Sequence, residues 1–89
     1  NMPKMTVQIA EEALRKEVEK LDKRAQLLGV NETKKKDEYR VTLLKAGKTG
    51  NAAIKKDVLE ACIAGEGQGN EVRKALGKAV SHLSIRYKR

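Results

Sequence analysis

Apolar residues near the N-terminus recur with a helical period. Their successive spacings are four, three, four and three residues, which predicts a helix over about residues 7–28 with a narrow, heptad-like seam. The seam residues are Leu14, Val18, Leu21, Ala25 and Leu28. Thr6 can cap the start of this helix and Gly29 can end it. The seam can pack on the rest of the domain or pair with a second copy of the chain.

The segment that follows is open to two interpretations. Residues 30–37 form a polar, lysine-rich connection. Tyr39, Val41 and Leu43 then alternate with polar residues as in a strand, yet Tyr39, Leu43 and Ala46 also fit one helical face. A strand here would need a partner, and the other alternating run lies at residues 83–88.

Two more helices are predicted in the second half of the chain. Thr49 or Asn51 can cap a helix over 51–64, whose apolar face is formed by Ile54, Val58, Ala61 and Cys62. A glycine-dense turn follows at 65–69. The last helix, over 70–83, has a buried stripe of Val72, Leu76, Ala79, Val80 and Leu83.

These elements predict a mostly α fold. It has three to four helices, at about 7–28, 51–64 and 70–83, with 37–46 as helix or strand. The alternative is a winged-helix-like α+β fold with short strands at 39–44 and 84–88. The 89 residues make one domain with a modest core, in which 38–89 is a basic helical portion.

The first residues are expected to lie outside the fold. Residues 1–5 are predicted to be disordered, and Asn1 before Met2 reads as a cloning remnant, so that Met2 or Met5 would be the native start.

The composition indicates which residue types form the core and which cellular compartment suits the protein. Phe and Trp are absent and there are two tyrosines, so the core must consist of Leu, Ile, Val and Ala. The sequence contains neither a long apolar span nor a secretory leader. A single cysteine excludes an internal disulfide. We therefore expect an intracellular, cytoplasmic protein in a reducing compartment, without contact to a membrane.

The charge points to a polyanionic partner. The formal net charge is +8, and residues 31–89 carry fourteen Lys/Arg against seven Asp/Glu. Residues 73–89 contain six basic side chains and no acidic one. Such an uneven distribution is typical of nucleic-acid binding, although a solubilising surface would give the same count.

The stretch KAGKTGNAA, residues 45–53, resembles a phosphate-binding loop because an apolar run precedes Gly47, Lys48 and Thr49. The phosphate loop needs a glycine five positions before Gly47, and that residue is Thr42. We therefore expect a turn that carries Lys45 and Lys48. The second glycine cluster, GEGQGN, has the wrong spacing for a dinucleotide fingerprint and follows a helix.

No catalytic chemistry is predicted. His82 is the single histidine and Cys62 the single cysteine, so one chain cannot build a Cys/His metal site. No nucleophile and base are paired by spacing. The protein is therefore expected to be a non-enzyme without metal or cofactor.

The basic residues give the leading functional hypothesis, a small nucleic-acid-binding protein. Lys74, Lys78 and Ser81 share a helical stripe away from the apolar one, and two helices joined by a glycine turn are helix-turn-helix-like. The predicted contact residues are Lys45, Lys48, Lys55, Lys56, Arg73, Lys74, Lys78, Ser81, Arg86, Lys88 and Arg89. Scarce aromatic residues disfavour base stacking, so duplex DNA is favoured over RNA.

Two alternatives remain open at this stage. The first is a helical interaction module, in which the N-terminal seam forms a coiled-coil homodimer or binds another helix while the basic tail docks on an acidic protein. The second is an RNA-binding or ribosome-associated factor.

Overall fold

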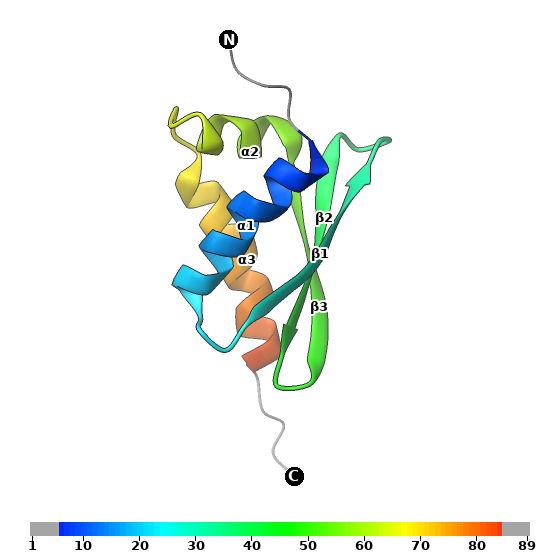
Figure 1. Cartoon of the computed structure of the whole chain (residues 1–89), viewed down its shortest axis with the longest axis vertical. Helices are drawn as coiled ribbons and strands as arrows, with labels where there is room; N and C mark the ends of the chain where they lie inside the picture. Colours follow the sequence, from blue (N-terminus) through cyan, green and yellow to red (C-terminus); the bar gives the residue numbers. More distant parts are fainter. Residues whose placement is uncertain (1–5, 85–89) are drawn as a thin grey trace.

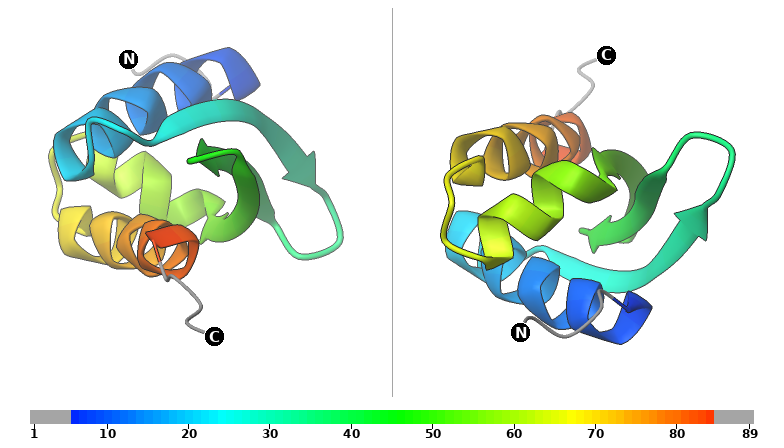
Figure 2. Two further views of the ribbon diagram at one scale, coloured as in Figure 1. Left: turned by 90° about the horizontal axis from the view of Figure 1, so that it is seen from below. Right: turned by 90° about the horizontal axis from the view of Figure 1, so that it is seen from above.

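The computed structural model describes residues 6–84, which form three helices and a three-stranded antiparallel sheet. In chain order the elements are α1 (Val7–Leu21), β1 (Gln26–Thr33), β2 (Glu38–Lys45), β3 (Lys48–Lys55), α2 (Lys56–Ile63) and α3 (Gly69–Ser84). The strands follow one another in the order β1-β2-β3. All three helices lie on one face of this curved sheet, with α1 against β1 and α3 against β3 (Figure 1, Figure 2).

The expectation of a mostly α fold is wrong, because three strands occupy the middle of the chain. The ambiguous run at 37–46 belongs to β2, in which Tyr39, Val41 and Leu43 face the helices and are at most 2% exposed. Two neighbouring strands, β1 and β3, supply the partners that a strand at this place requires. Of the winged-helix-like alternative, the α+β class and a strand over 39–44 are present. Ser84 belongs to α3, and the rest of the strand expected at 84–88 lies outside the described residues.

The first helix is shorter than the seam predicts. Thr6 caps it, accepting a hydrogen bond from the Ile9 backbone nitrogen at 3.2 Å, but α1 ends at Leu21 and the backbone of Asp22 is extended. Leu14 and Val18 are fully buried in the protein's own core. The last two seam residues, Ala25 and Leu28, are not helical, so the five residues do not form one continuous seam.

The helix expected over 51–64 is only half present. Residues 51–55 belong to β3, where Ala52 and Ile54 point into the core. Within the predicted range, only the residues of α2, Lys56–Ile63, are helical. The glycine-dense connection to α3 is observed, with positive φ at Gly65 and Gly67, and the predicted last helix over 70–83 is present as α3.

The stretch that resembled a phosphate loop is the tip of the β2–β3 hairpin. Lys45 pairs with Lys48, which leaves Ala46 and Gly47 as a two-residue turn. Both have positive φ, 53° and 77°, as a type I′ turn requires. The turn residues therefore reverse the chain, and the GKT sequence continues into β3 instead of opening a helix.

One continuous core joins the sheet to the helices. Its fully buried large side chains are Leu14, Leu43, Leu59, Leu76, Val18, Val41 and Val72. They come from every element except β1 and β3, which contribute Leu27, Val30 and Ile54 at slightly higher exposure. The predicted aliphatic composition of the core is confirmed for residues 6–84, in which Tyr39 is the one aromatic residue and is buried.

Candidate nucleic-acid interface

Positive charge is concentrated in the sheet and in α3. Residues 22–55 carry nine Lys/Arg against four Asp/Glu, and α3 carries three against one. By contrast, α1 carries three against four and is therefore balanced. The net positive charge of the described residues therefore comes from residues 22–55 and from α3, while α1 is nearly neutral.

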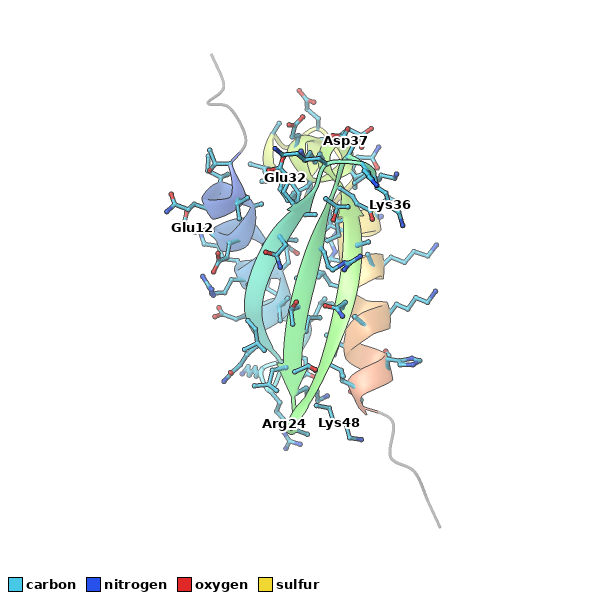
Figure 3. All side chains as sticks on the ribbon, turned by 90° about the vertical axis from the view of Figure 1, so that its right-hand side faces the viewer. Glu12, Arg24, Glu32, Lys36, Asp37 and Lys48 are labelled. Atoms are coloured by element: carbon cyan, nitrogen blue, oxygen red, sulfur yellow. The ribbon has the colours of Figure 1, made fainter. Side chains whose placement is uncertain are left out.

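Five lysines follow the edge where β3 lies beside α3. We call this set the basic edge: Lys36, Lys48, Lys55, Lys74 and Lys78. Lys36 and Lys48 mark opposite ends of the sheet (Figure 3). Lys55 lies beside Lys36, because its Nζ donates to the Lys36 carbonyl oxygen at 3.3 Å. Lys78 lies beside the middle of β3, since it lines a groove together with Asn51, Ala52 and Ala53.

The two α3 lysines are the most available cations of this edge. Lys74 and Lys78 are exposed, and neither forms an ion pair within residues 6–84. Ser81 is exposed on the same side of the helix. The core stripe of α3, Val72, Leu76, Val80 and Leu83, faces the sheet and holds the lysines outward.

Two of the predicted contact residues are instead engaged within the protein. Lys45 is largely buried and binds the Asp22 carboxylate and the Ser84 hydroxyl. Lys56 binds Glu32 and lies 5.7 Å from the centroid of the Tyr39 ring. These two lysines tie the loop after α1 and the start of α2 to the sheet, so we leave them out of the interface.

The remaining predicted residues are divided between surface and tail. Arg73 faces α1, with a guanidinium nitrogen 3.7 Å from Glu17 and a second bond to Asn70 at 2.9 Å. Lys55 makes only a loose ion pair with Glu38, at 3.9 Å, and stays mostly exposed. Arg86, Lys88 and Arg89 lie outside the described residues.

Sequence reasoning missed several residues near the basic edge. Lys34, Lys35 and Lys36 form the tip of the β1–β2 hairpin, where they extend beyond the sheet. His82 lines the groove between β3 and α3. The signal for the hairpin was available, because the short run TKKKDE separates two segments with β-prone residues, but β1 lacks clean alternation.

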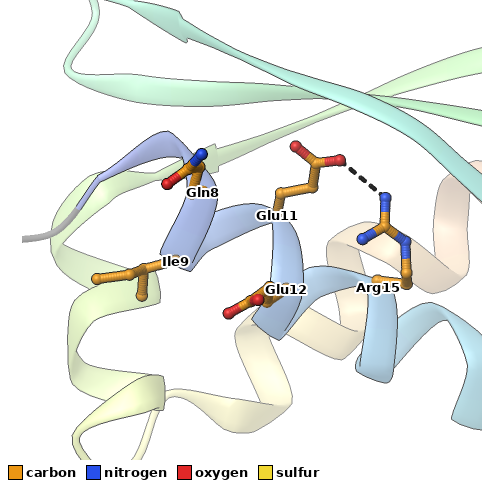
Figure 4. Close-up of a pocket in the computed structure, with 5 residues that line it drawn as sticks. All are labelled: Gln8, Ile9, Glu11, Glu12 and Arg15. Carbon is orange, nitrogen blue, oxygen red and sulfur yellow. Dashed lines mark hydrogen bonds and ion pairs between the residues drawn. The ribbon is translucent and has the colours of Figure 1, made fainter.

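The opposite side offers no comparable surface. A shallow hollow on α1 is lined by Gln8, Ile9, Glu11, Glu12 and Arg15, all from one helix (Figure 4). Glu11 and Arg15 neutralise each other in an ion pair of 2.8 Å. Glu12 leaves this hollow slightly acidic, opposite in sign to the basic edge, and its side chains do not come from converging elements.

Among the titratable groups of residues 6–84, three have shifted pKa values, and all three shifts have structural causes. The hydrogen bond from Lys45 lowers the pKa of Asp22 below its ordinary 3.8. The bond to Glu32 raises the pKa of Lys56 above 10.5, and burial raises that of Tyr39 above 10.0. None of these groups lies in an open cleft with a nucleophile, so they stabilise the fold rather than indicate catalysis.

Within residues 6–84, no three His, Cys, Asp or Glu side chains gather as metal ligands would. None of the helices described here has both the length and the apolar character to cross a bilayer.

No family model, curated protein or solved structure matches the chain. The fold and the charge together define a small α+β domain with one basic edge.

Proposed function

We propose that the protein binds duplex nucleic acid through the basic edge. The observation that carries the proposal is the set of five lysines on β3, on α3 and at the adjacent β1–β2 turn, of which Lys74 and Lys78 have no carboxylate partner among the described residues. Lysine side chains arranged in this way neutralise phosphates and release condensed counterions. Contacts of this kind position a duplex and discriminate little between sequences.

The dimensions of the edge suit a duplex. β3 has eight residues, which span about 26 Å at ~3.3 Å per residue. A duplex presents one charge per ~1.7 Å of its axis, so several phosphates can lie within reach of the five lysines. Tyr39 is buried, which leaves the described surface without an aromatic ring for base stacking and favours double strands.

The proposal is tested by fluorescence anisotropy with a labelled DNA duplex of about 20 base pairs at about 50 and 200 mM salt. The informative variant is Lys74→Glu with Lys78→Glu. Its matched control is Lys16→Glu with Lys23→Glu, which changes net charge equally on the α1 side, where both lysines are exposed. We expect the α3 variant to lose most of its affinity and the control to lose much less.

Equal losses in the two variants would mean that net charge alone attracts the duplex, and binding that ignores salt would contradict phosphate contact. An unlabelled RNA hairpin added as competitor separates DNA from RNA. Stronger displacement by the RNA than by the same concentration of unlabelled DNA would favour an RNA-binding function.

A protein-interaction function through the N-terminal seam is less well supported. Three of the five seam residues, Leu14, Val18 and Ala25, are buried in the core, and only Leu21 and Leu28, at 38% and 51% exposure, remain accessible. A dimer of α1 helices is therefore not part of the proposed function.

A further inference from the structure

A groove runs between β3 and α3, inside the basic edge. It has a volume of about 360 Å³ and is lined by Asn51, Ala52, Ala53, Ala75, Lys78, Ala79 and His82. One wall is the outer strand of the sheet and the other is the flank of a helix. In Figure 3, the side of β3 that faces away from β2 lies along α3, whose long side chains extend away from the sheet.

The outer side of β3 presents unused main-chain groups. In a hairpin with a two-residue turn, the closing pair, Lys45 with Lys48, exchanges hydrogen bonds, and the bonded pairs then alternate along the ladder. The residues of β3 at 48, 50, 52 and 54 therefore bond to β2. Thr49, Asn51 and Ala53 direct their N–H and C=O groups outward, where no described strand pairs with them.

The two edges of the sheet differ in how open they are. At the β1 edge, a bulge between Leu27 and Gly29 interrupts the register, and bulges are one of the devices that block pairing with another strand. The register of β3 is continuous over all eight residues. Between Lys48 and Lys55 the strand contains no charge and no proline, so its own residues do not oppose a further strand.

Small side chains make room for that strand. Ala52, Ala53, Ala75 and Ala79 are four of the seven lining residues, so an extended main chain that approaches β3 meets mostly small side chains. Methyl groups of this kind are poor partners for phosphate but good partners for short aliphatic side chains. The groove thus has a property that the nucleic-acid proposal does not use.

The charge around the groove indicates that its ligand is acidic. Lys78 lies in the lining, while Lys48 and Lys55 stand at the two ends of β3, and none of the lining residues is acidic. Lys48 and Lys55 are seven residues apart on a regular strand, so their side chains point to opposite faces of the sheet. An extended segment that alternates carboxylates with small apolar side chains could turn its carboxylates toward Lys78 and still meet the alanines of the groove.

We infer that the β3–α3 groove binds an extended acidic segment of a partner protein, added as a fourth strand beside β3. Main-chain hydrogen bonds to Thr49, Asn51 and Ala53 supply affinity, and alternate side chains supply specificity. Because Lys78 serves both ligands, such a segment excludes duplex nucleic acid from the basic edge. The inference does not need the nucleic-acid proposal to be correct, since it rests on the strand edge and the alanines.

The experiment uses the full chain and an eight-residue peptide, equal in length to β3, that alternates glutamate with valine. Isotope-labelled protein is titrated with it and followed by amide chemical shifts. We expect saturable shifts centred on the amides of Thr49, Asn51 and Ala53, with slower hydrogen exchange at these three. The same peptide with lysine in place of glutamate should not bind.

Two controls separate strand addition from plain charge attraction. A peptide N-methylated on alternate residues, along the edge that would face β3, keeps its charge but cannot pair, and it should bind at least about tenfold more weakly. Lys78→Glu should weaken the unmodified peptide by about three- to tenfold, while Lys16→Glu on the far side of α1 should change little.

Absence of binding by the glutamate peptide, shifts centred away from β3, or equal affinity of the N-methylated peptide would each overturn the inference. So would a duplex that shifts the three β3 amides while the peptide does not, because the groove would then serve nucleic acid. A duplex that fails to bind, with the peptide still bound at β3, would refute the proposed function and leave this inference intact.

Discussion

At the scale of single residues, Ala46 adopts a conformation that its side chain disfavours. Its φ of 53° lies in the left-handed region, which costs a residue with a Cβ about 1–2 kcal/mol. Type I′ turns favour asparagine followed by glycine, and glycine already follows at 47. Ala46→Asn should therefore raise the free energy of unfolding by about 0.5–1 kcal/mol, measured by urea denaturation.

The neighbouring position provides the opposite control. Gly47 has φ of 77° and open space where a Cβ would be, so the effect of Gly47→Ala is conformational rather than steric. This variant should lower stability by a similar amount. A stabilising Gly47→Ala, or a destabilising Ala46→Asn, would contradict the type I′ assignment.

The ion pair between Asp22 and Lys45 gives a prediction for acid stability. The hydrogen bond from Lys45 lowers the pKa of Asp22 in the folded protein below 3.8. The unfolded chain therefore binds a proton first, and the carboxylate stabilises the fold fully only above pH 3.8. As pH falls through the lower, folded pKa, that contribution is lost.

Asp22→Asn should accordingly destabilise the protein at neutral pH, with a deficit that shrinks as the pH falls below 3.8. Urea denaturation of both proteins from neutral to acidic pH measures the difference. Glu12→Gln, on the exposed face of α1, serves as control and should show little deficit at any pH. A deficit in Asp22→Asn that is independent of pH would show that the carboxylate charge is not what stabilises the loop.

At the scale of elements, the basic edge exists only because α3 docks on the sheet. Leu76 is fully buried in the middle of this contact, and near its end Leu83 approaches the place of a Gly50 Cβ to 3.2 Å. Leu76→Ala should cost about 2–5 kcal/mol of unfolding free energy, measured by urea denaturation. Leu28→Ala, at an exposed position, should change it by no more than about 0.5 kcal/mol.

The elements differ in how well the sequence predicts them. α3 is predictable because four core residues keep a strict helical period. β1 is not, because the extra residue Leu28 in its bulge breaks the alternation of Leu27 and Val30. β3 could not be predicted for another reason, because its glycine, asparagine and alanine residues have little strand preference. Its extended conformation depends on pairing with β2. The apparent heptad up to Leu28 joins residues of a helix, a loop and a strand by coincidence of spacing.

At the scale of the whole molecule, the sequence predicts an excess of positive surface charge but not where on the surface the charged residues come together. The lysines of α3 are predictable as an exposed stripe because they share a helical period. That Lys36, Lys48 and Lys55 belong to the same edge follows only from the hairpins, which bring residues far apart in the sequence together. Lys45 and Lys56 could not be excluded beforehand, because their partners Asp22 and Glu32 are more than twenty residues away.

This edge makes a quantitative prediction for salt dependence. Each phosphate contact contributes about −0.9 to the slope of log affinity against log salt for duplex DNA. If Lys74 and Lys78 each contact one phosphate, Lys74→Gln with Lys78→Gln should make the slope shallower by about 1.8. Lys16→Gln with Lys23→Gln removes the same charge from residues outside the edge and should leave the slope nearly unchanged. Anisotropy titrations at four or more salt concentrations give both slopes. Equal slopes for the two variants would show that the α3 lysines attract the duplex without contacting it.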